Sequence, residues 1–149
     1  MRTLPNDFFF EEIKEIISQG ESVEILVRGN SMSPYLRDKK DKVVIAPLKD
    51  TTPQKGDIIL FFHSGQYLLH RVIKKKENYF IVQGDGIVKK QENVLLTDII
   101  GIVRYIIHPS GKCVSVNCRS HLIYWRFWLL IRPFRSFFLS IYMKLNKII

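Results

Sequence analysis

Residues 58–73 read IILFFHSGQYLLHRVI, and this stretch decides the fold class. Two apolar runs, at 58–62 and 67–73, flank the short segment His63-Ser64-Gly65-Gln66. Runs rich in Ile, Phe, Leu and Val that are joined by a few turn-forming residues are typical of a β-hairpin. The stretch therefore predicts two antiparallel strands joined by a tight turn.

Further strands are expected on both sides of this hairpin. Val23, Ile25 and Val27 alternate with polar residues, as the residues on one face of a strand do. Short apolar runs recur at 43–45, 79–82, 99–107 and 114–116, and Asp and Gly residues at 38–41, 55–57 and 84–86 mark turns between them. The region 21–118 therefore predicts an all-β domain.

A short helix is expected before this domain, within residues 1–20. Asn6 or Asp7 can cap it, and Gly20 can end it. Between them the apolar residues follow helical spacing, at Phe9, Ile13, Ile16 and Ile17. The first ten residues lack a basic segment followed by an apolar run, so no secretory signal peptide is expected.

The composition suits one folded domain. The chain has 149 residues, of which 46% are hydrophobic and 25% are charged. Cys113 and Cys118 lack the spacing of a zinc site or a disulfide framework, so two free thiols or one short-range bridge both remain open. No acidic or cysteine cluster accompanies His63, His108 or His121, and we expect no metal site and no cofactor.

The net charge of +9 is concentrated at the carboxyl end. Residues 1–98 are nearly balanced, whereas residues 99–149 contain eight Lys and Arg residues and no acidic residue. Basic residues mixed with Trp, Phe and Leu suit an anionic membrane surface, because aromatic rings settle among the lipid headgroups while cations meet the phosphates. We therefore expect this region to contact a membrane surface, and we do not expect the protein to bind nucleic acid.

Residues 119–149 predict a basic, aromatic, helical tail. The apolar run at 122–131 is interrupted by Arg126, and Pro133 follows it. A membrane-spanning helix needs about 20 mainly apolar residues, so we expect two short helices in the membrane interface instead. Beyond the proline, one side of the second helix is apolar and the opposite side is polar: Phe134, Phe137, Phe138, Ile141, Tyr142 and Leu145 against Arg135, Ser136, Lys144 and Lys147. The alternative is that these aromatic residues pack on the β domain or on a second copy of the chain. From charge placement, we expect a site on the cytoplasmic face of the membrane.

The stretch that carries chemistry is RGNSMSP, residues 28–34, directly after the first expected strand. A serine that follows a glycine-containing turn at a strand end can expose its hydroxyl while backbone N–H groups point to the same space. That geometry suits acyl transfer, since the hydroxyl attacks a carbonyl and the amides stabilise the oxyanion. Taken alone, the stretch favours an ordinary turn serine at this position.

Four further blocks follow in order: Gly56-Asp57-Ile58-Ile59, Leu69-His70-Arg71-Val72-Ile73, Gln83-Gly84-Asp85-Gly86 and Ile100-Gly101. Together with residues 28–34, they resemble the signal peptidase I superfamily of serine peptidases, which includes the self-cleaving domains of SOS-type repressors. The resemblance covers residues 23–105. It implies an antiparallel β barrel or sandwich and a serine endopeptidase that acts on a peptide or protein substrate.

The resemblance also implies roles for individual residues. Ser31 matches the nucleophile, and Met32 and Pro34 match the residues that shape its turn. His70, followed by Arg71, matches the general base of the histidine branch of the superfamily. Imidazole titrates near pH 6.5, so it can accept the serine proton at neutral pH. Asp85 matches an acidic residue of that branch that orients the histidine or braces the site.

Two positions depart from the pattern of the superfamily. Gly29 stands where many signal peptidases have a second serine, and Lys89, Lys90 and Gln91 stand where the histidine branch has a second acid, with Glu92 nearby but out of step. The sequence therefore predicts a peptidase that processes a leader or signal segment, with an inactive peptide-binding module as the alternative. A repressor is not expected, because about 20 residues before the first strand are too few for a helix-turn-helix domain.

Overall fold

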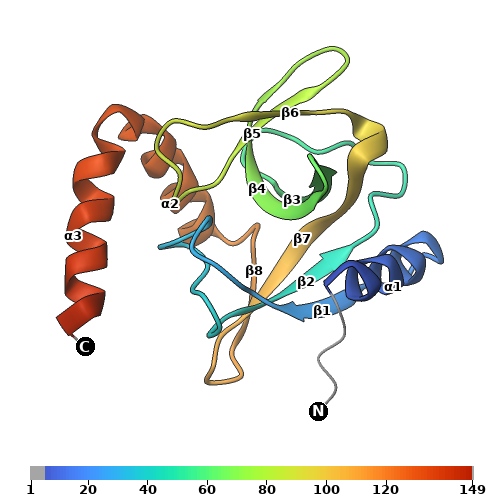
Figure 1. Cartoon of the computed structure of the whole chain (residues 1–149), viewed down its shortest axis with the longest axis horizontal. Coiled ribbons are helices and arrows are strands. Elements are labelled where there is room, and N and C mark those ends of the chain that lie inside the picture. The colour runs from blue at the N-terminus through green and yellow to red at the C-terminus, as the bar shows by residue number, and fades with distance from the viewer. Residues whose placement is uncertain (1–5, 149) are drawn as a thin grey trace.

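The computed structural model describes residues 6–148. Figure 1 shows the strands at the centre, α1 on one side of them, and α2 and α3 on the other. The elements in chain order are α1 (Asn6–Ser18), β1 (Val23–Leu26), β2 (Lys42–Ala46), β3 (Ile58–His63), β4 (Gln66–Lys75), β5 (Phe80–Gln83), β6 (Glu92–Val94), η1 (Leu96–Asp98), β7 (Ile99–Ile107), β8 (Cys113–Ser115), α2 (Arg119–Leu130), η2 (Arg132–Phe134) and α3 (Arg135–Ile148).

The strands form an antiparallel sheet in the order β1-β2-β7-β3-β4-β5-β6, with β8 added to β7. The prediction of a mainly β fold with helices at both ends is therefore confirmed. Strands β1 and β6 end this order, and within residues 6–148 they are not paired with each other, so the sheet is not closed. A closed barrel, which was one form of the expected core, is not formed.

The β3–β4 hairpin forms as its sequence predicts. His63 pairs with Gln66, and the two residues between them, Ser64 and Gly65, have φ angles of 50° and 76°. Positive φ at both central residues is the backbone of the hairpin turn that matches the twist of the flanking strands. The register set by this turn places His70 opposite Ile59 on β3.

The first four residues of β3 lie between two apolar clusters, which explains why all four are apolar. Ile58 and Leu60 belong to one cluster, and Ile59 and Phe61 belong to the other. Successive side chains of a strand point to opposite faces, so a strand that is buried on both faces is apolar at every position. Apolar layers thus lie on both sides of β3, which pairs with β4, the strand that carries His70.

Helix α1 covers the first of these clusters, as its spacing predicts. Ile13 and Ile17 are buried in it, and the ring of Phe10 stacks on Tyr67 of β4 with the centroids 4.5 Å apart. The expected capping residues, Asn6 and Asp7, lie at the start of the helix, but their side chains are outside the described part of the structure.

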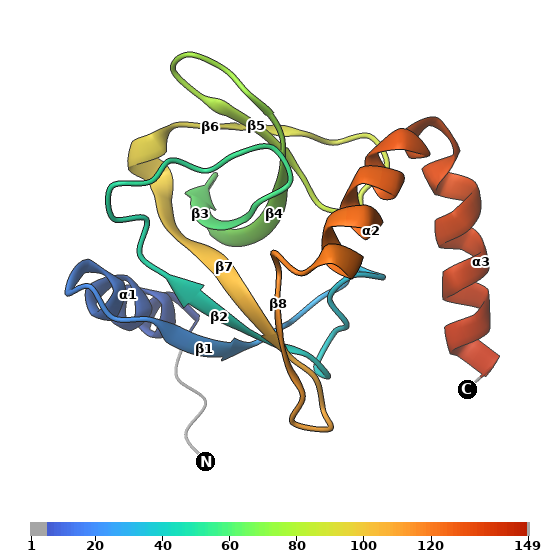
Figure 2. The ribbon, with the colours of Figure 1, turned by 180° about the vertical axis from the view of Figure 1, so that it is seen from behind.

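The two expected helices of the tail are present as α2 and α3, joined by the short η2 turn that contains Pro133. In Figures 1 and 2, α2 lies between the sheet and α3. Within the described residues, neither helix is long and apolar enough to cross a membrane. Arg135 departs from the expected polar side of α3, because it is buried, while Phe134, Phe137 and Phe138 are exposed.

The two cysteines are free thiols, so of the two alternatives for Cys113 and Cys118 the short-range bridge is not formed.

Candidate active site

Ser31 lies in a loop between β1 and β2, and this loop is closed on itself by backbone hydrogen bonds. The N–H of Val27 donates to the carbonyl of Asp41 at 2.9 Å, and the N–H of Lys39 donates to the carbonyl of Val27 at 2.8 Å. We call residues 27–41 the serine loop. Gly29 has a φ of 83°, a left-handed conformation that favours glycine.

The serine loop lies against the turn at 84–87 that follows β5. The N–H of Gly86 donates to the carbonyl of Ser31 at 2.9 Å. A Cβ atom on Gly84 would lie 2.2 Å from the Ser31 carbonyl oxygen, and one on Gly86 would lie 2.2 Å from the Asn30 carbonyl oxygen. Only glycine allows this approach, so the Gly-Asp-Gly sequence is required by the contact between the two segments.

The residues next to Ser31 are held by burial and hydrogen bonds, whereas the Ser31 hydroxyl is not. Met32 is buried, and its sulfur accepts the N–H of Asp85 at 3.5 Å; Pro34 is half-buried. The buried Ser33 hydroxyl donates to the side-chain oxygen of Asn30 at 3.3 Å. Neither the hydroxyl nor the backbone N–H of Ser31 has a hydrogen-bond partner among the described residues. A substrate carbonyl can therefore use both groups.

His70 is buried in β4 and is held by a single carboxylate. Its Nδ1 lies 2.9 Å from Oε2 of Glu92, which is itself buried on β6. A carboxylate accepts hydrogen bonds, so Nδ1 carries the proton and the neutral ring keeps its free electron pair on Nε2. Nε2 has no partner among the described residues. Glu92 thus selects the tautomer in which the buried Nε2 carries the free electron pair.

Burial lowers the pKa of His70 below its usual value of 6.5, although Glu92 opposes this shift. Burial disfavours the charged imidazolium, whereas the carboxylate favours it. Because the net pKa shift is downward, His70 is neutral at pH 7 and is able to take up a proton.

Ser31 and His70 both lie beside Gly84, and they are not hydrogen-bonded to each other. Arg71 pairs with Gln83 in the β4–β5 ladder, so His70 and Gly84 are the next residues beyond this pair. Gly84 in turn lies against the Ser31 carbonyl.

Asp85 and Arg71 form a buried ion pair beside the site. Nε and Nη2 of Arg71 donate to the two carboxylate oxygens of Asp85 at 2.9 and 2.8 Å, and Nη1 donates to the carbonyl of Gly56 at 2.9 Å. Burial lowers the pKa of Arg71, but Asp85 outweighs this effect and raises the pKa above its usual value. Of its two expected roles, Asp85 therefore has the geometry of a brace, and the residue that contacts His70 is Glu92.

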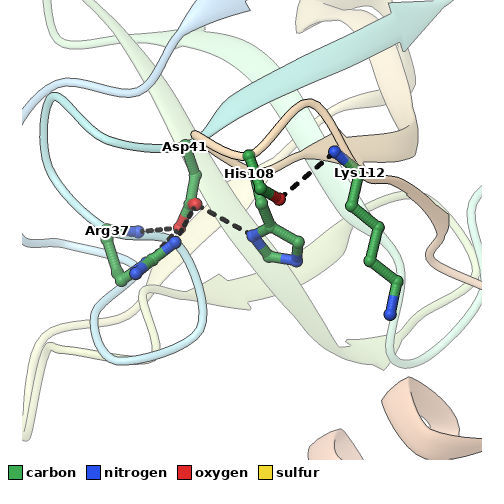
Figure 3. Close-up of polar contacts among 5 residues, drawn as sticks. Arg37, Asp41, His108 and Lys112 are labelled. Carbon is green, nitrogen blue, oxygen red and sulfur yellow. Dashed lines mark hydrogen bonds and ion pairs between the residues drawn. The ribbon is translucent and has the colours of Figure 1, made fainter.

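A second brace ties the serine loop to the turn between β7 and β8. Figure 3 shows Asp41 between Arg37 and His108. The backbone N–H of His108 donates to the carbonyl of Lys112 at 3.0 Å. The carboxylate of Asp41 accepts hydrogen bonds from Nη2 of Arg37 at 2.7 Å and from Nδ1 of His108 at 3.0 Å. Burial raises the pKa of Asp41, but these donors outweigh it and lower the pKa to about 2.

Helix α2 completes the support of the site from the outside. Nε1 of the buried Trp128 donates to the carbonyl of Asp85 at 3.0 Å. Trp125 packs against Gly56, where even a Cβ atom would collide with its ring. Beyond α2, Nη1 of Arg135 donates to the carbonyl of Ile87 at 3.1 Å. The turn at 84–87 is therefore held between the serine loop on one side and the tail on the other.

Glu92 is the residue that the sequence analysis did not include in the site. It lies on β6, a three-residue strand that was not predicted, and faces the same side of the strand as the buried Val94. The alternation of Glu92 and Val94 around an exposed Asn93 was the available signal, but three residues are too few to establish a strand period.

A scan of the chain against models of known protein families finds no match, and no curated protein matches it. The assignment of roles in this site therefore rests on the residues themselves: a serine with a free hydroxyl, a histidine held by a buried carboxylate, and the braced loops that carry them.

Proposed function

We propose that the protein is a serine endopeptidase of the signal-peptidase-like class, with Ser31 as nucleophile, His70 as general base and Glu92 as the residue that positions His70. The observation that carries the proposal is the buried His70–Glu92 pair, with Nδ1 bonded at 2.9 Å and Nε2 free. A histidine held in this way by a carboxylate, next to a serine with a free hydroxyl, is the arrangement used for nucleophilic catalysis.

In the proposed cycle, Ser31 Oγ attacks the carbonyl carbon of the scissile peptide bond while its proton passes to Nε2 of His70. The carbonyl oxygen becomes an oxyanion, and the unpartnered N–H of Ser31 is placed to donate to it. His70 then gives the proton to the leaving amine, which departs and leaves an acyl-serine ester. Water, deprotonated by His70, hydrolyses the ester and restores Ser31.

The substrate class we propose is an extended leader or signal segment of a peptide or protein. Strand β1 is at the edge of the sheet and leads directly into the serine loop. An extended peptide can pair with an exposed edge strand through backbone hydrogen bonds, which would carry its scissile bond toward Ser31.

The alternative function is a binding module that holds such a peptide without cutting it. Two observations favour it: Ser31 and His70 are not hydrogen-bonded, and Gly29 leaves no second hydroxyl near the oxyanion. The surrounding braces would serve either function equally.

The test is a digest of a proteome-derived peptide library with the purified full chain and with Ser31→Ala, His70→Ala and Ser33→Ala, each checked for folding by circular dichroism. Loss of the base or the nucleophile removes at least about 10³-fold of activity in such sites. We expect Ser33→Ala, a matched serine of the same loop, to keep cutting while the other two variants do not. Equal cleavage by Ser31→Ala would refute the proposal, and an uncut library with the folded wild type would favour the binding module.

A further inference from the structure

The sides of α2, η2 and α3 that are turned away from the body of the protein are apolar and uncovered. Leu130 is 79% exposed, Phe134 66% and Phe137 64%. We define the outer apolar face as six exposed residues: Phe127, Leu130, Phe134, Phe137, Ile141 and Leu145. Single exposed apolar side chains are normal on a protein surface, but six of them on three consecutive elements indicate a contact with another phase or partner.

The outer apolar face is not the side by which α3 is attached to the rest of the protein. Helix α3 meets the body through the buried Arg135 and the half-buried Leu139 and Tyr142, which recur at helical spacing. Phe137, Ile141 and Leu145 recur at the same spacing but on a different side of the helix. The second apolar stripe therefore exists in addition to the one that attaches α3 to the protein.

The charged residues of α2, η2 and α3 are all basic. Lys144 and Lys147 are exposed on α3, and Arg126 is exposed on α2. Residues 99–149 contain no Asp or Glu that could neutralise them. A protein interface usually combines both signs at its rim, whereas an apolar stripe bordered only by cations complements a lipid surface with anionic headgroups.

We propose that the outer apolar face docks on an anionic membrane surface, with α2 and α3 lying in the plane of the interface. Helix α3 has 14 residues, and within residues 6–148 neither helix can span a bilayer. An amphipathic helix of this kind buries its apolar side among the acyl chains near the headgroups while its cations contact lipid phosphates.

The same helices support the candidate active site from their inner side. Trp128 and Arg135 bond to the carbonyls of Asp85 and Ile87, in the turn that touches Ser31. Docking would therefore hold the site next to the membrane, where leader segments of exported chains are found. This last consequence rests on the proposed function, but membrane binding itself does not, because vesicle binding is measured without a substrate.

The test is co-sedimentation of the full chain with vesicles of equimolar phosphatidylcholine and phosphatidylglycerol, and with vesicles of phosphatidylcholine alone. We compare Leu130→Ser/Phe137→Ser with the matched control Leu95→Ser/Leu96→Ser, whose residues are exposed near η1. Each buried apolar side chain contributes on the order of a tenfold gain in partitioning, so we expect the first variant to bind at least about tenfold more weakly and the control to bind as the wild type does.

A second pair of variants tests the charge. Lys144→Ala/Lys147→Ala is expected to weaken binding to the anionic vesicles by roughly 30-fold, because each of the two cations contributes about 1 kcal/mol near such a surface. The control Lys14→Ala/Lys74→Ala removes two exposed lysines from α1 and β4 and is expected to leave binding unchanged.

Three results would overturn the proposal. The first is a folded wild type that does not sediment with anionic vesicles, and the second is equal binding by wild type and Leu130→Ser/Phe137→Ser. The third is a lipid-free dimer, seen by analytical ultracentrifugation, that the same variant dissociates, because the face would then bind a second copy of the chain. A wild type that cuts peptides but does not bind vesicles would refute membrane docking and leave the peptidase assignment standing.

Discussion

At the scale of single residues, the contact between His70 and Glu92 determines what the site can do. Both side chains are buried, and the carboxylate selects the tautomer that leaves Nε2 free. Asp85, the acid expected from the sequence to orient His70 or brace the site, is occupied on both oxygens by Arg71. The two acids therefore have separable tasks, since Glu92 orients His70 and Asp85 holds the turn at 84–87.

Glu92→Gln is predicted to lower kcat/KM by about 10²–10⁴-fold, because an amide can turn its N–H toward Nδ1 and stabilise the wrong tautomer. Glu92 also raises the pKa of His70 against the effect of burial, so its loss is expected to lower that pKa further. The measurement is the pH profile of kcat/KM. The wild-type rate should fall at acid pH with a pKa below the ordinary 6.5 of histidine, and in the variant this limb should move to lower pH.

The matched control is Glu77→Gln, since Glu77 is exposed in the turn between β4 and β5. It is expected to retain both rate and pH profile. An unchanged acid limb in Glu92→Gln would contradict the positioning role, even if the rate falls.

At the scale of elements, the serine loop depends on Asp41 for its shape. Asp41 contacts Val27 and Arg37 within the serine loop, and it contacts His108 in the turn that follows β7. The pKa of Asp41 is about 2, well below the ordinary value of 3.8, so the folded protein holds the ionised form. A group with a lowered pKa stabilises the fold above its unfolded pKa, and this contribution is lost as the pH falls through the folded value.

Asp41→Asn is therefore predicted to cost on the order of 2 kcal/mol of unfolding free energy at pH 7. The difference from wild type should shrink as the pH falls from about 4 toward about 2, because the wild type loses its advantage there. Urea unfolding across this pH range measures both effects. Asp50→Asn, at an exposed acid, should change little at any pH, and a penalty for Asp41→Asn that is independent of pH would argue against an ionised Asp41 as the source.

The long strands and the hairpin could be predicted, because apolar runs and Ser64-Gly65 specify them locally. Strand β6 could not, because its three residues are held by pairing with β5 rather than by their own pattern. Glu92 was missed as a partner of His70 for the same reason, since only this pairing brings two residues 22 positions apart into contact.

The burial of Arg135 could not be predicted from the sequence either. Helical spacing placed it on the polar side of α3, and nothing local indicates that Trp128 and the Ile87 carbonyl lie there to receive it. Contacts between segments far apart in the chain decide such positions, whereas periodicity reports only which residues share a face.

At the scale of the whole molecule, the tail and the β domain are in direct contact at the site. Trp125 and Trp128 of α2 pack on the turns that carry Gly56 and Asp85, while the opposite sides of the tail remain exposed, apolar and basic. One pair of helices thus faces the candidate active site on its inner side and, in our proposal, a membrane on its outer side.

The most direct test of the central claim is a comparison of protein and peptide amino termini in the native host that carries the intact gene, Ser31→Ala or the loop control Ser33→Ala. If the protein is a serine peptidase, a defined set of termini will be present with the intact gene and with Ser33→Ala and will be missing with Ser31→Ala. The same termini in all three strains, with each protein folded and expressed, would contradict catalysis by Ser31.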